Sequence, residues 1–282
     1  MCGIAGAINA GFSYENVIQS LGHRGPDEQN GYKNNNVDFF HLRLSILDIA
    51  CGKQPMHLGE KYTIIFNGEI YNHAEIRKQF NITGNTSSDT ETLLLLYDRF
   101  GTDFLQYLDG MFAFVIHDKI KNQLFIARDR AGEKPFYYYF DHKKFVFASE
   151  LNCLKNMVTL EIENTNFFQY LRLGSFYRQF TPYKNVTELK AGSFLTIDCT
   201  TLLINETRWW NINDYYRKER KDTFEDSLEK TNSFLHKAVK RRLESSDLEV
   251  GSFLSGGIDS GLVTAIANEY NKNLKTFTVS FD

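Results

Sequence analysis

Four short apolar segments follow one another between residues 109 and 150, and short polar turns separate them. They read MFAFVIH, QLFIAR, PFYYYF and KFVFAS, and much of the chain's aromatic content, 24 Phe and 15 Tyr, lies in stretches of this kind. Aromatic and branched residues in short runs bounded by turns are typical of β-strands. The pattern predicts an antiparallel meander over this region.

The first residues, MCGIAGAI, combine a short strand predicted over 3–9 with a cysteine directly behind the initiator methionine. Gly3 is small, which is compatible with removal of Met1. Cys2 then carries a free α-amino group beside its thiol, with ordinary pKa values of about 8 and about 8.5. One residue would hold both a nucleophile and a base. A free cysteine also packs as a small apolar residue, and position 2 alone favours that structural interpretation.

Composition limits the classes of partner. The net charge is −3, from 32 basic and 35 acidic side chains, which argues against nucleic acid and against an anionic membrane surface. The N-terminus lacks the basic flank of a signal peptide, and no apolar run approaches the roughly 18 residues of a membrane span. The cysteines are far apart, so we expect neither a disulfide framework nor a zinc site, and a cytoplasmic location fits. They are Cys2, Cys51, Cys153 and Cys199.

Two polar sites interrupt apolar stretches. Arg43 lies inside 37–49, VDFFHLRLSILDI, where an arginine needs a carboxylate partner that is either structural or part of a ligand. Residues 62–72, YTIIFNGEIYN, predict a strand followed by a turn at Asn67-Gly68. The Asn67 amide and the Gly68 N–H are donors of the type that stabilises a tetrahedral oxyanion. An ordinary hairpin turn is the simpler interpretation of this pair taken alone.

A helix is predicted over 86–101, with Ser88 as N-cap, Glu91 completing a capping box and Gly101 at its end. Asp89 lies at the start of this helix. Its carboxylate either complements the helix dipole or receives a ligand ammonium group. The charged residues of RDRAGEKP, at 128–135, favour a structural ion-pair cluster.

The last part of the chain has a different pattern. Residues 206–222 are interpreted as a linker, and a helix capped by Asp222 and Glu225 follows. A strand at 250–254, the small-residue loop SGGIDS at 255–260 and a helix to Tyr270 then succeed one another, and LKTFTVSFD predicts a second strand. A loop between a strand and a helix N-terminus is a ready anion site.

Eight motifs together resemble one family. MCGI, HRGPD, HLRLSILD, FNGEIYNH, SDTE, GMFAFVIHD, RDRAGEKPFYY and LSGGIDS occur in the order found in glutamine-dependent asparagine synthetases. The resemblance implies an N-terminal nucleophile hydrolase of αββα sandwich type, followed by the beginning of a parallel-sheet ATP pyrophosphatase domain. It implies that glutamine is hydrolysed in the first domain, and that ATP activates a carboxylate, aspartate in this family, for attack by the ammonia.

The resemblance also assigns roles to residues. Cys2 is the nucleophile and its freed amine the proton acceptor, with Asn67 and Gly68 as the oxyanion hole. Glutamine binding is assigned to Arg43, Ser45, Ile46, Leu47, Asn67, Gly68, Glu69 and Asp89. ATP binding is assigned to Leu254, Ser255, Gly256, Gly257, Asp259, Ser260 and Val279, with Asp259 near a Mg²⁺ ion held through the pyrophosphate. No metal is expected in the glutaminase site.

We therefore expect a glutaminase domain at 1–205, a linker at 206–222 and an incomplete ATP-binding domain at 223–282. The resemblance allows a homodimer. Ala131 and Glu133 stand where many asparagine synthetases have a bulkier apolar pair, a variant familiar in relatives that amidate sugar carboxylates in surface-glycan synthesis. A sugar carboxylate is therefore the alternative acceptor. A truncated protein that only binds glutamine, or has a regulatory role, is the non-enzymatic alternative.

Overall fold

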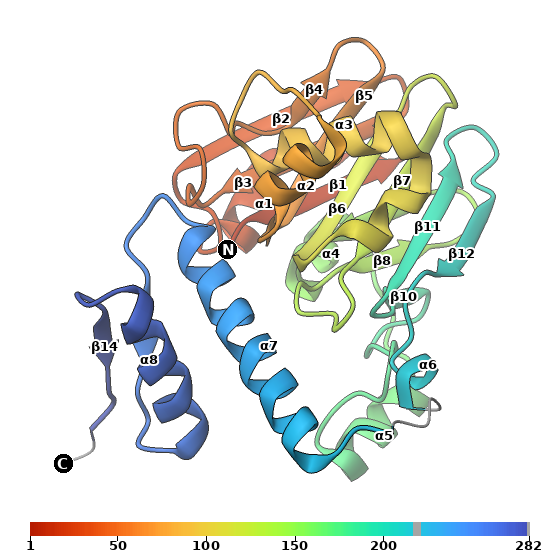
Figure 1. Cartoon of the computed structure of the whole chain (residues 1–282). Helices are drawn as coiled ribbons and strands as arrows, with labels where there is room; N and C mark the ends of the chain where they lie inside the picture. Colours follow the sequence, from red (N-terminus) through yellow and green to blue (C-terminus); the bar gives the residue numbers. More distant parts are fainter. Residues whose placement is uncertain (217–220, 281–282) are drawn as a thin grey trace. The chain divides into compact units, whose positions relative to one another are not determined.

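The structure, a computed structural model, describes residues 1–216 and 221–280, and the chain forms two compact units, Met1–Asn211 and Ile212–Asp282. The first unit contains two antiparallel six-stranded sheets (Figure 1). Sheet A has the order β10 (Val186–Glu188), β8 (Tyr137–Phe140), β9 (Phe145–Ala148), β1 (Gly3–Ile8), β3 (Val37–Arg43), β2 (Glu28–Asn34). Sheet B has the order β12 (Ile204–Arg208), β11 (Ser193–Asp198), β7 (Gln123–Arg128), β6 (Gly110–Asp118), β5 (Tyr62–Ile70), β4 (Met56–Leu58).

Helices cover the outer face of each sheet. Helices α1 and α4 pack on sheet A, and α2, α3 and the 3₁₀ helix η1 pack on sheet B. The helices of this unit are α1 (Tyr14–Leu21), α2 (His73–Phe80), α3 (Asp89–Phe100), η1 (Gly101–Tyr107), α4 (Leu151–Met157) and α5 (Asn164–Leu173). This layering confirms the predicted αββα sandwich.

Three buried layers follow from the alternation of side chains along each strand. Ile4 and Phe39 of sheet A meet Ile65 and Val115 of sheet B in the central layer between the sheets. The neighbours of these residues point outward, so that Phe40, for example, packs under α1 and α4. Along each strand, every second residue points into the central layer. Only these residues can line a site between the two sheets.

Two predictions about strands were wrong. The segments between 109 and 150 form two hairpins in different sheets, because the chain crosses from sheet B to sheet A between β7 and β8. Asn67-Gly68 is not a turn either, since β5 continues through both residues and stays paired with β6 as far as Ile70.

The cap of α3 was predicted in part. Ser88 is its N-cap and accepts the Thr90 N–H at 3.2 Å, and the helix ends at Gly101. Glu91 does not form the capping box. Its carboxylate instead accepts the N–H groups of Asn85 and Thr86, at 2.9 and 2.8 Å. The glutamate therefore holds the loop before the helix rather than the cap residue itself.

The second unit contains α6 (Asn213–Tyr216), α7 (Phe224–Glu244), β13 (Gly251–Phe253), α8 (Ile258–Tyr270) and β14 (Lys275–Phe277). Strands β13 and β14 are parallel neighbours joined by α8. The capping box of α7 uses Thr223 and Asp226, one residue after the predicted pair Asp222 and Glu225. The first unit extends to Asn211 rather than 205, because β12 pairs with β11. No helix within the described part of the chain is long and apolar enough to cross a membrane.

Candidate active site

Strand parity brings the candidate residues of the first unit together. β1 and β3 pair with Gly3 opposite Leu42 and Ile4 opposite His41, which sets Cys2 beside Arg43. Cys2 shares the parity of Ile4, and Asn67 and Glu69 share the parity of Ile65, so these side chains point into the space between the sheets. Residues from both sheets therefore converge at one end of the sandwich.

A pocket is present at this end. Its lining includes the predicted residues Cys2, Arg43, Ile46, Leu47, Asn67, Gly68, Glu69 and Asp89. Ser45 is not part of this lining, and its N–H donates to the Asp27 carboxylate at 2.7 Å. The pocket is also lined by residues that the sequence analysis did not single out as candidate site residues: Met1, Leu44, Gly52, Gln54, Phe66, Ser88, Thr90, Met111 and Lys134.

The Cys2 thiol is held by the backbone that follows β3. The Leu44 N–H donates to Sγ at 3.4 Å, and the thiol reaches the Leu44 carbonyl at 3.7 Å. Arg24, from the HRGPD motif, donates to the Cys2 carbonyl at 3.1 Å and pairs with Glu150 at 2.8 Å. Burial raises the pKa of the Cys2 thiol, against the opposing effects of Leu44, the N-terminal amine and Arg43. The thiol is therefore protonated near neutral pH and needs a base to become a nucleophile.

Asn67 carries an unsatisfied amide on the pocket wall. Its side chain is fully buried, and neither Nδ2 nor Oδ1 has a hydrogen-bond partner within the described part of the chain. A buried amide without partners costs stability, and such groups in native structures call for an explanation. A donor that faces a pocket beside a cysteine is suited to an oxygen that becomes negative during a reaction.

The outer edge of β5 supplies a second donor. β4 covers this edge only as far as Ile64, and beyond it side chains replace the missing strand. Gln54 Oε1 accepts the Phe66 N–H at 2.7 Å, and Asp89 accepts the Ile70 N–H at 3.0 Å. Since backbone groups alternate along a strand, the Gly68 N–H points to the same edge, between these two contacts.

Gly68 is required by a close approach between strands. A Cβ at this position would lie 2.1 Å from the Met111 carbonyl oxygen and 2.7 Å from the Phe112 Cα, both on β6. Only a residue without a side chain allows β5 and β6 to pair here. The same glycine leaves the backbone open toward the pocket.

The Arg43 guanidinium lies on the pocket wall and organises the loop that follows β3. It donates to Glu28 Oε1 at 3.1 Å and to the carbonyls of Ile49, Leu47 and Asp48 at 3.1, 3.3 and 2.8 Å. A ligand carboxylate would therefore share or replace contacts that the guanidinium already makes. The fixed fork of an arginine can accommodate such an exchange without losing its charge.

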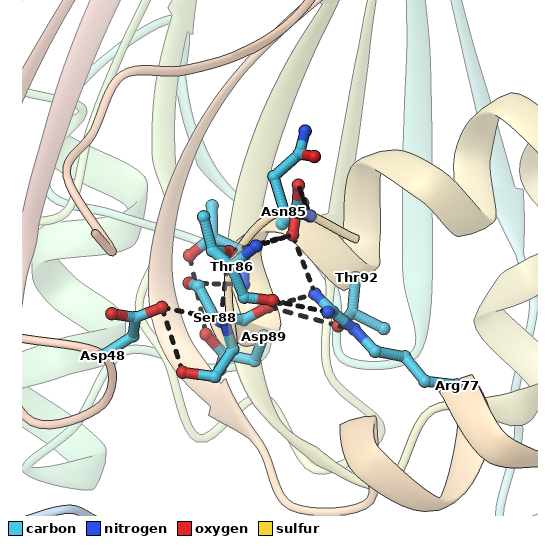
Figure 2. A network of polar contacts seen from close by, with 10 residues as sticks. Asp48, Arg77, Asn85, Thr86, Ser88, Asp89 and Thr92 are labelled. Atoms are coloured by element: carbon cyan, nitrogen blue, oxygen red, sulfur yellow. Dashed lines mark hydrogen bonds and ion pairs between the residues drawn. The ribbon is translucent and has the colours of Figure 1, made fainter. Parts of the chain in front are cut away.

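A network of polar contacts fixes the segment that carries Asp89 (Figure 2). Arg77 donates to the carbonyls of Thr86 and Ser88 at 2.6 and 2.8 Å. Asp48, in the loop held by Arg43, accepts the Ser87 N–H at 2.9 Å. The loop after β3 is thereby tied to the start of α3.

Asp89 itself is buried, with 5% of its surface exposed. Burial raises its pKa to about 6, although hydrogen bonds from Ile70 and Thr90 oppose this effect. None of the described residues, 1–216 and 221–280, forms an ion pair with this carboxylate, so a ligand ammonium group would stabilise its ionised form. Glu69 is buried on the same wall. The pocket therefore offers two carboxylates and two cations, Arg43 and Lys134, so it can pair both charged groups of a zwitterionic amino acid.

In the second unit, the predicted phosphate loop joins β13 to α8. Leu254 and Val279 follow the carboxyl ends of the parallel strands β13 and β14, which are the ends where ligands bind in such sheets. Gly257 is the N-cap of α8 without a side-chain hydrogen bond, so the first N–H groups of the helix are open to an anion. Gly256 adopts a positive φ of 81°, and the Ser255 and Ser260 hydroxyls lie 3.0 Å apart.

The loop offers little to a metal on its own. Asp259 is in the first turn of α8, and no group of three or more His, Cys, Asp or Glu side chains suited to a metal occurs among residues 1–216 and 221–280. A divalent cation bound here would depend on the phosphate groups of a nucleotide. The side chains of this loop therefore fit a cation that binds together with a nucleotide.

The RDRAGEKP motif is not the ion-pair cluster that its composition favours. Arg128 pairs with Glu188, outside the motif, at 2.7 Å. Asp129 accepts the N–H groups of Ala131, Glu133 and Lys134, at 3.0, 2.9 and 3.0 Å. The motif is a backbone-capping loop that carries Lys134 to the pocket. Only the positions of Gly132 and Pro135 in the sequence hinted at such a loop.

Comparisons with known proteins agree with this geometry. Residues 1–210 match the family model described as glutamine amidotransferase domain, and residues 230–282 match that of asparagine synthase. The chain is 35% identical to the putative asparagine synthetase [glutamine-hydrolyzing] 2 of Methanocaldococcus jannaschii, over all of this chain and 60% of that protein. It is 34% identical to asparagine synthetase [glutamine-hydrolyzing] 3 of Bacillus subtilis, over all of this chain and 48% of that protein.

The chain thus spans about half the length of the curated relatives it matches. Among solved structures, it resembles the glutamine phosphoribosylpyrophosphate amidotransferase from B. subtilis, complexed with ADP and GMP. The TM-score is 0.52 at 19% identity, covering 98% of this chain and 65% of that one. This is a likeness of fold.

Proposed function

This chain belongs to the class II glutamine amidotransferase family, and from that premise we propose that its pocket hydrolyses L-glutamine to glutamate and ammonia. Cys2 is the nucleophile once Met1 has been removed. Arg43 holds the α-carboxylate of glutamine, and Glu69 and Asp89 hold its α-ammonium group. The backbone of residues 45–47 completes this binding site.

The chemistry proceeds through a thioester. The α-amine of Cys2 takes the thiol proton, and the sulfur attacks the amide carbon of glutamine. Asn67 and the Gly68 N–H stabilise the oxyanion of the tetrahedral intermediate. The C–N bond breaks as the protonated α-amine returns its proton to the leaving nitrogen, which departs as ammonia. Water then attacks the thioester with the amine as base, and glutamate is released.

The buried, unpartnered amide of Asn67 is the observation that carries this proposal. A purely structural asparagine in a core would have hydrogen-bond partners, because each unpaired amide group costs about 1–3 kcal/mol. The amide lies on the wall of the pocket that contains Cys2. A group that is unsatisfied at rest and satisfied in the transition state favours the reaction over mere binding.

We further propose that the ammonia serves ATP-dependent amidation of aspartate to asparagine, with formation of AMP and pyrophosphate. This extends to the whole protein what the names of its relatives say of them. The loop from Ser255 to Ser260 would hold the pyrophosphate of ATP, with Asp259 near the Mg²⁺ ion. Leu254 and Val279 would line the adenine and ribose. In this proposal the first unit, Met1–Asn211, is the glutaminase domain, and the second unit, Ile212–Asp282, contains the beginning of the ATP-binding domain. Cytoplasmic location and a homodimer are part of the same proposal.

Ala131 and Glu133 favour one alternative, in which the acceptor is a sugar carboxylate. The glutaminase reaction is the same in both cases. Asparagine formation from aspartate, ATP and glutamine separates the two acceptors when it is measured on the chain together with any further part of the protein.

The test of the glutaminase is intact mass combined with turnover. We expect a mass without Met1, release of glutamate from glutamine, and covalent labelling of Cys2 by an electrophilic glutamine analogue. Cys2→Ala should abolish both turnover and labelling, while Cys51→Ala, which changes an exposed cysteine, should retain both. Active protein that keeps Met1 would refute the mechanism. Protein that binds glutamine without releasing glutamate would support a regulatory role instead.

A further inference from the structure

Lys134 is a buried cation on the pocket wall. It is 3% exposed, and it lines the pocket together with Cys2 and Glu69. Its ammonium group donates to Met1 Sδ at 2.7 Å, and it forms no ion pair with a carboxylate of any residue that the structure describes. Burying an ammonium group without a paired carboxylate is costly. Its position therefore calls for a role in the site.

The surrounding loop fixes the backbone of this residue on both sides. The Lys134 N–H donates to Asp129 at 3.0 Å, and Arg128 Nε donates to the Lys134 carbonyl at 2.7 Å. A lysine in an unconstrained loop would turn its ammonium group to solvent. Here the backbone contacts hold the side chain toward the pocket, next to the N-terminus.

We propose that Lys134 keeps the α-amino group of the mature Cys2 neutral, so that this amine can accept the thiol proton. The inference rests on the proposed function, since it concerns the amine that removal of Met1 creates. A cation disfavours a second positive charge close to it. Because Lys134 contacts Met1, loss of Met1 leaves its ammonium group beside the new N-terminus.

Arg24 lowers the pKa of the terminal amine as well, and by more than Lys134 does in the chain with Met1. Arg24 is close to Cys2, but its charge is paired with Glu150. In the chain with Met1, burial lowers the pKa of the N-terminal amine, the Cys2 thiolate and Asp27 raise it, and Arg24 and Lys134 lower it. Burial lowers the pKa of Lys134 and Arg24 lowers it further, while Glu133, Asp129 and Glu69 oppose this shift.

The pH profile of glutaminase kcat/KM tests the proposal. Activity requires the neutral amine and the ionised Asp89, so the acidic limb reports both groups, and only the contribution of the amine should respond to Lys134. Lys134→Met should move this limb upward by roughly one pH unit, as expected for the loss of one nearby charge. Lys134→Arg should leave the limb close to its original pH. Lys121→Met, at a lysine whose side chain is 58% exposed, is the matched control and should leave the profile unchanged.

A merely structural role predicts a different result, in which Lys134→Met lowers kcat/KM equally at every pH. An unmoved limb would overturn the inference. Lys134→Gln is a second neutral variant if Lys134→Met fails to fold, which circular dichroism would reveal.

Competitive acetylation of the terminal amine across pH, read by mass spectrometry of the N-terminal peptide, gives the amine pKa without any turnover. We expect a higher pKa in Lys134→Met than in the unmodified protein. If Cys2 is terminal and the two pKa values agree, this inference fails and the proposed function stands. If they differ but no glutamine is hydrolysed, the proposed function fails alone. If the labelled amine belongs to Met1, both fail.

Discussion

The His41 imidazole donates its Nε2 proton to the Phe66 carbonyl at 3.1 Å, and this bond joins β3 of one sheet to β5 of the other directly before Asn67. A carbonyl can only accept, so the contact fixes the tautomer. The Nδ1 atom of the ring is buried without a partner. Gln54 accepts the Phe66 N–H, so side chains hold both the N–H and the carbonyl of Phe66.

His41 should make the protein sensitive to acid. Burial lowers its pKa to about 4, against about 6.5 in the unfolded chain. As pH falls below 6.5, the unfolded chain takes up a proton that the folded protein refuses until about pH 4, so stability is lost across this window. At pH 5 the loss is about 2 kcal/mol. His41→Gln should reduce the stability difference between pH 7.5 and pH 5 by that amount in urea unfolding.

The exposed His142 provides the control for this measurement. His142→Asn, which keeps a residue suited to the positive φ of 65° at that position, should leave the difference between the two pH values unchanged. An unchanged difference in His41→Gln as well would mean that the histidine is not held neutral by the fold.

Asn67→Ala should separate activity from stability. Loss of one oxyanion donor costs roughly a hundredfold or more in turnover. The free energy of unfolding should stay similar, because the removed amide has no hydrogen-bond partner in the folded protein. Steady-state glutamate release and chemical unfolding measure the two effects. Asn205→Ala, on the exposed edge strand β12, should change neither, and an unaltered rate in Asn67→Ala would exclude the oxyanion role.

Asp89→Asn should strengthen the fold and weaken glutamine binding. The folded pKa is about 6, above the unfolded value of about 3.9. Stability therefore rises as pH falls from 6 toward 4, and the ionised form costs about 3 kcal/mol at pH 8. The neutral asparagine should recover part of this cost in urea unfolding at pH 8. Its KM for glutamine should rise at least about tenfold, since it lacks the charge that pairs with ammonium.

The same residue predicts a pH dependence for the unmodified protein. The KM for glutamine should increase as pH falls through about 6, because protonation removes the charge of Asp89. Asp98→Asn, a carboxylate that pairs with the exposed Lys61, should not alter KM. Equal KM values for the Asp89 and Asp98 variants would show that Asp89 does not bind the glutamine ammonium group.

Gly68→Ala should destabilise the sandwich. Its Cβ would lie 2.1 Å from the Met111 carbonyl oxygen, so β5 and β6 would have to separate. We expect a loss of about 2–4 kcal/mol, the range of strongly disruptive single substitutions, together with loss of glutaminase activity. Gly11→Ala, where a Cβ would meet open space, should leave both nearly unchanged. A Gly68→Ala protein of normal stability would contradict the close approach.

Much of the first unit could be predicted from residue patterns, because apolar alternation and Ser88 as a helix cap act locally. The roles assigned from the family motifs also include eight of the 17 residues that line the pocket. Asn67-Gly68 misled the sequence analysis because the pair is a turn signal in isolation. Here contact with β6, which is distant along the chain, keeps both residues in a strand.

Lys134 and Gln54 escaped prediction for a related reason. A lysine among other charges is normally solvated, and nothing local indicates that Asp129 would bind backbone amides and turn that lysine inward. Gln54 acts on a strand edge that exists only because β4 is short. These roles depend on which backbone groups are left without a neighbouring strand to pair with. The sequence does not display that directly.

β1 lies between β3 and β9 in sheet A, and the Ile4 N–H donates to the Ser149 hydroxyl at 3.0 Å. The strand that follows the proposed nucleophile, Cys2, is thus central in its sheet, although it precedes both neighbouring strands along the chain. At about 5–20 residues per second, the opposite flank arrives on the order of ten seconds later. During that interval the proposed removal of Met1 could take place before the sheet encloses Cys2.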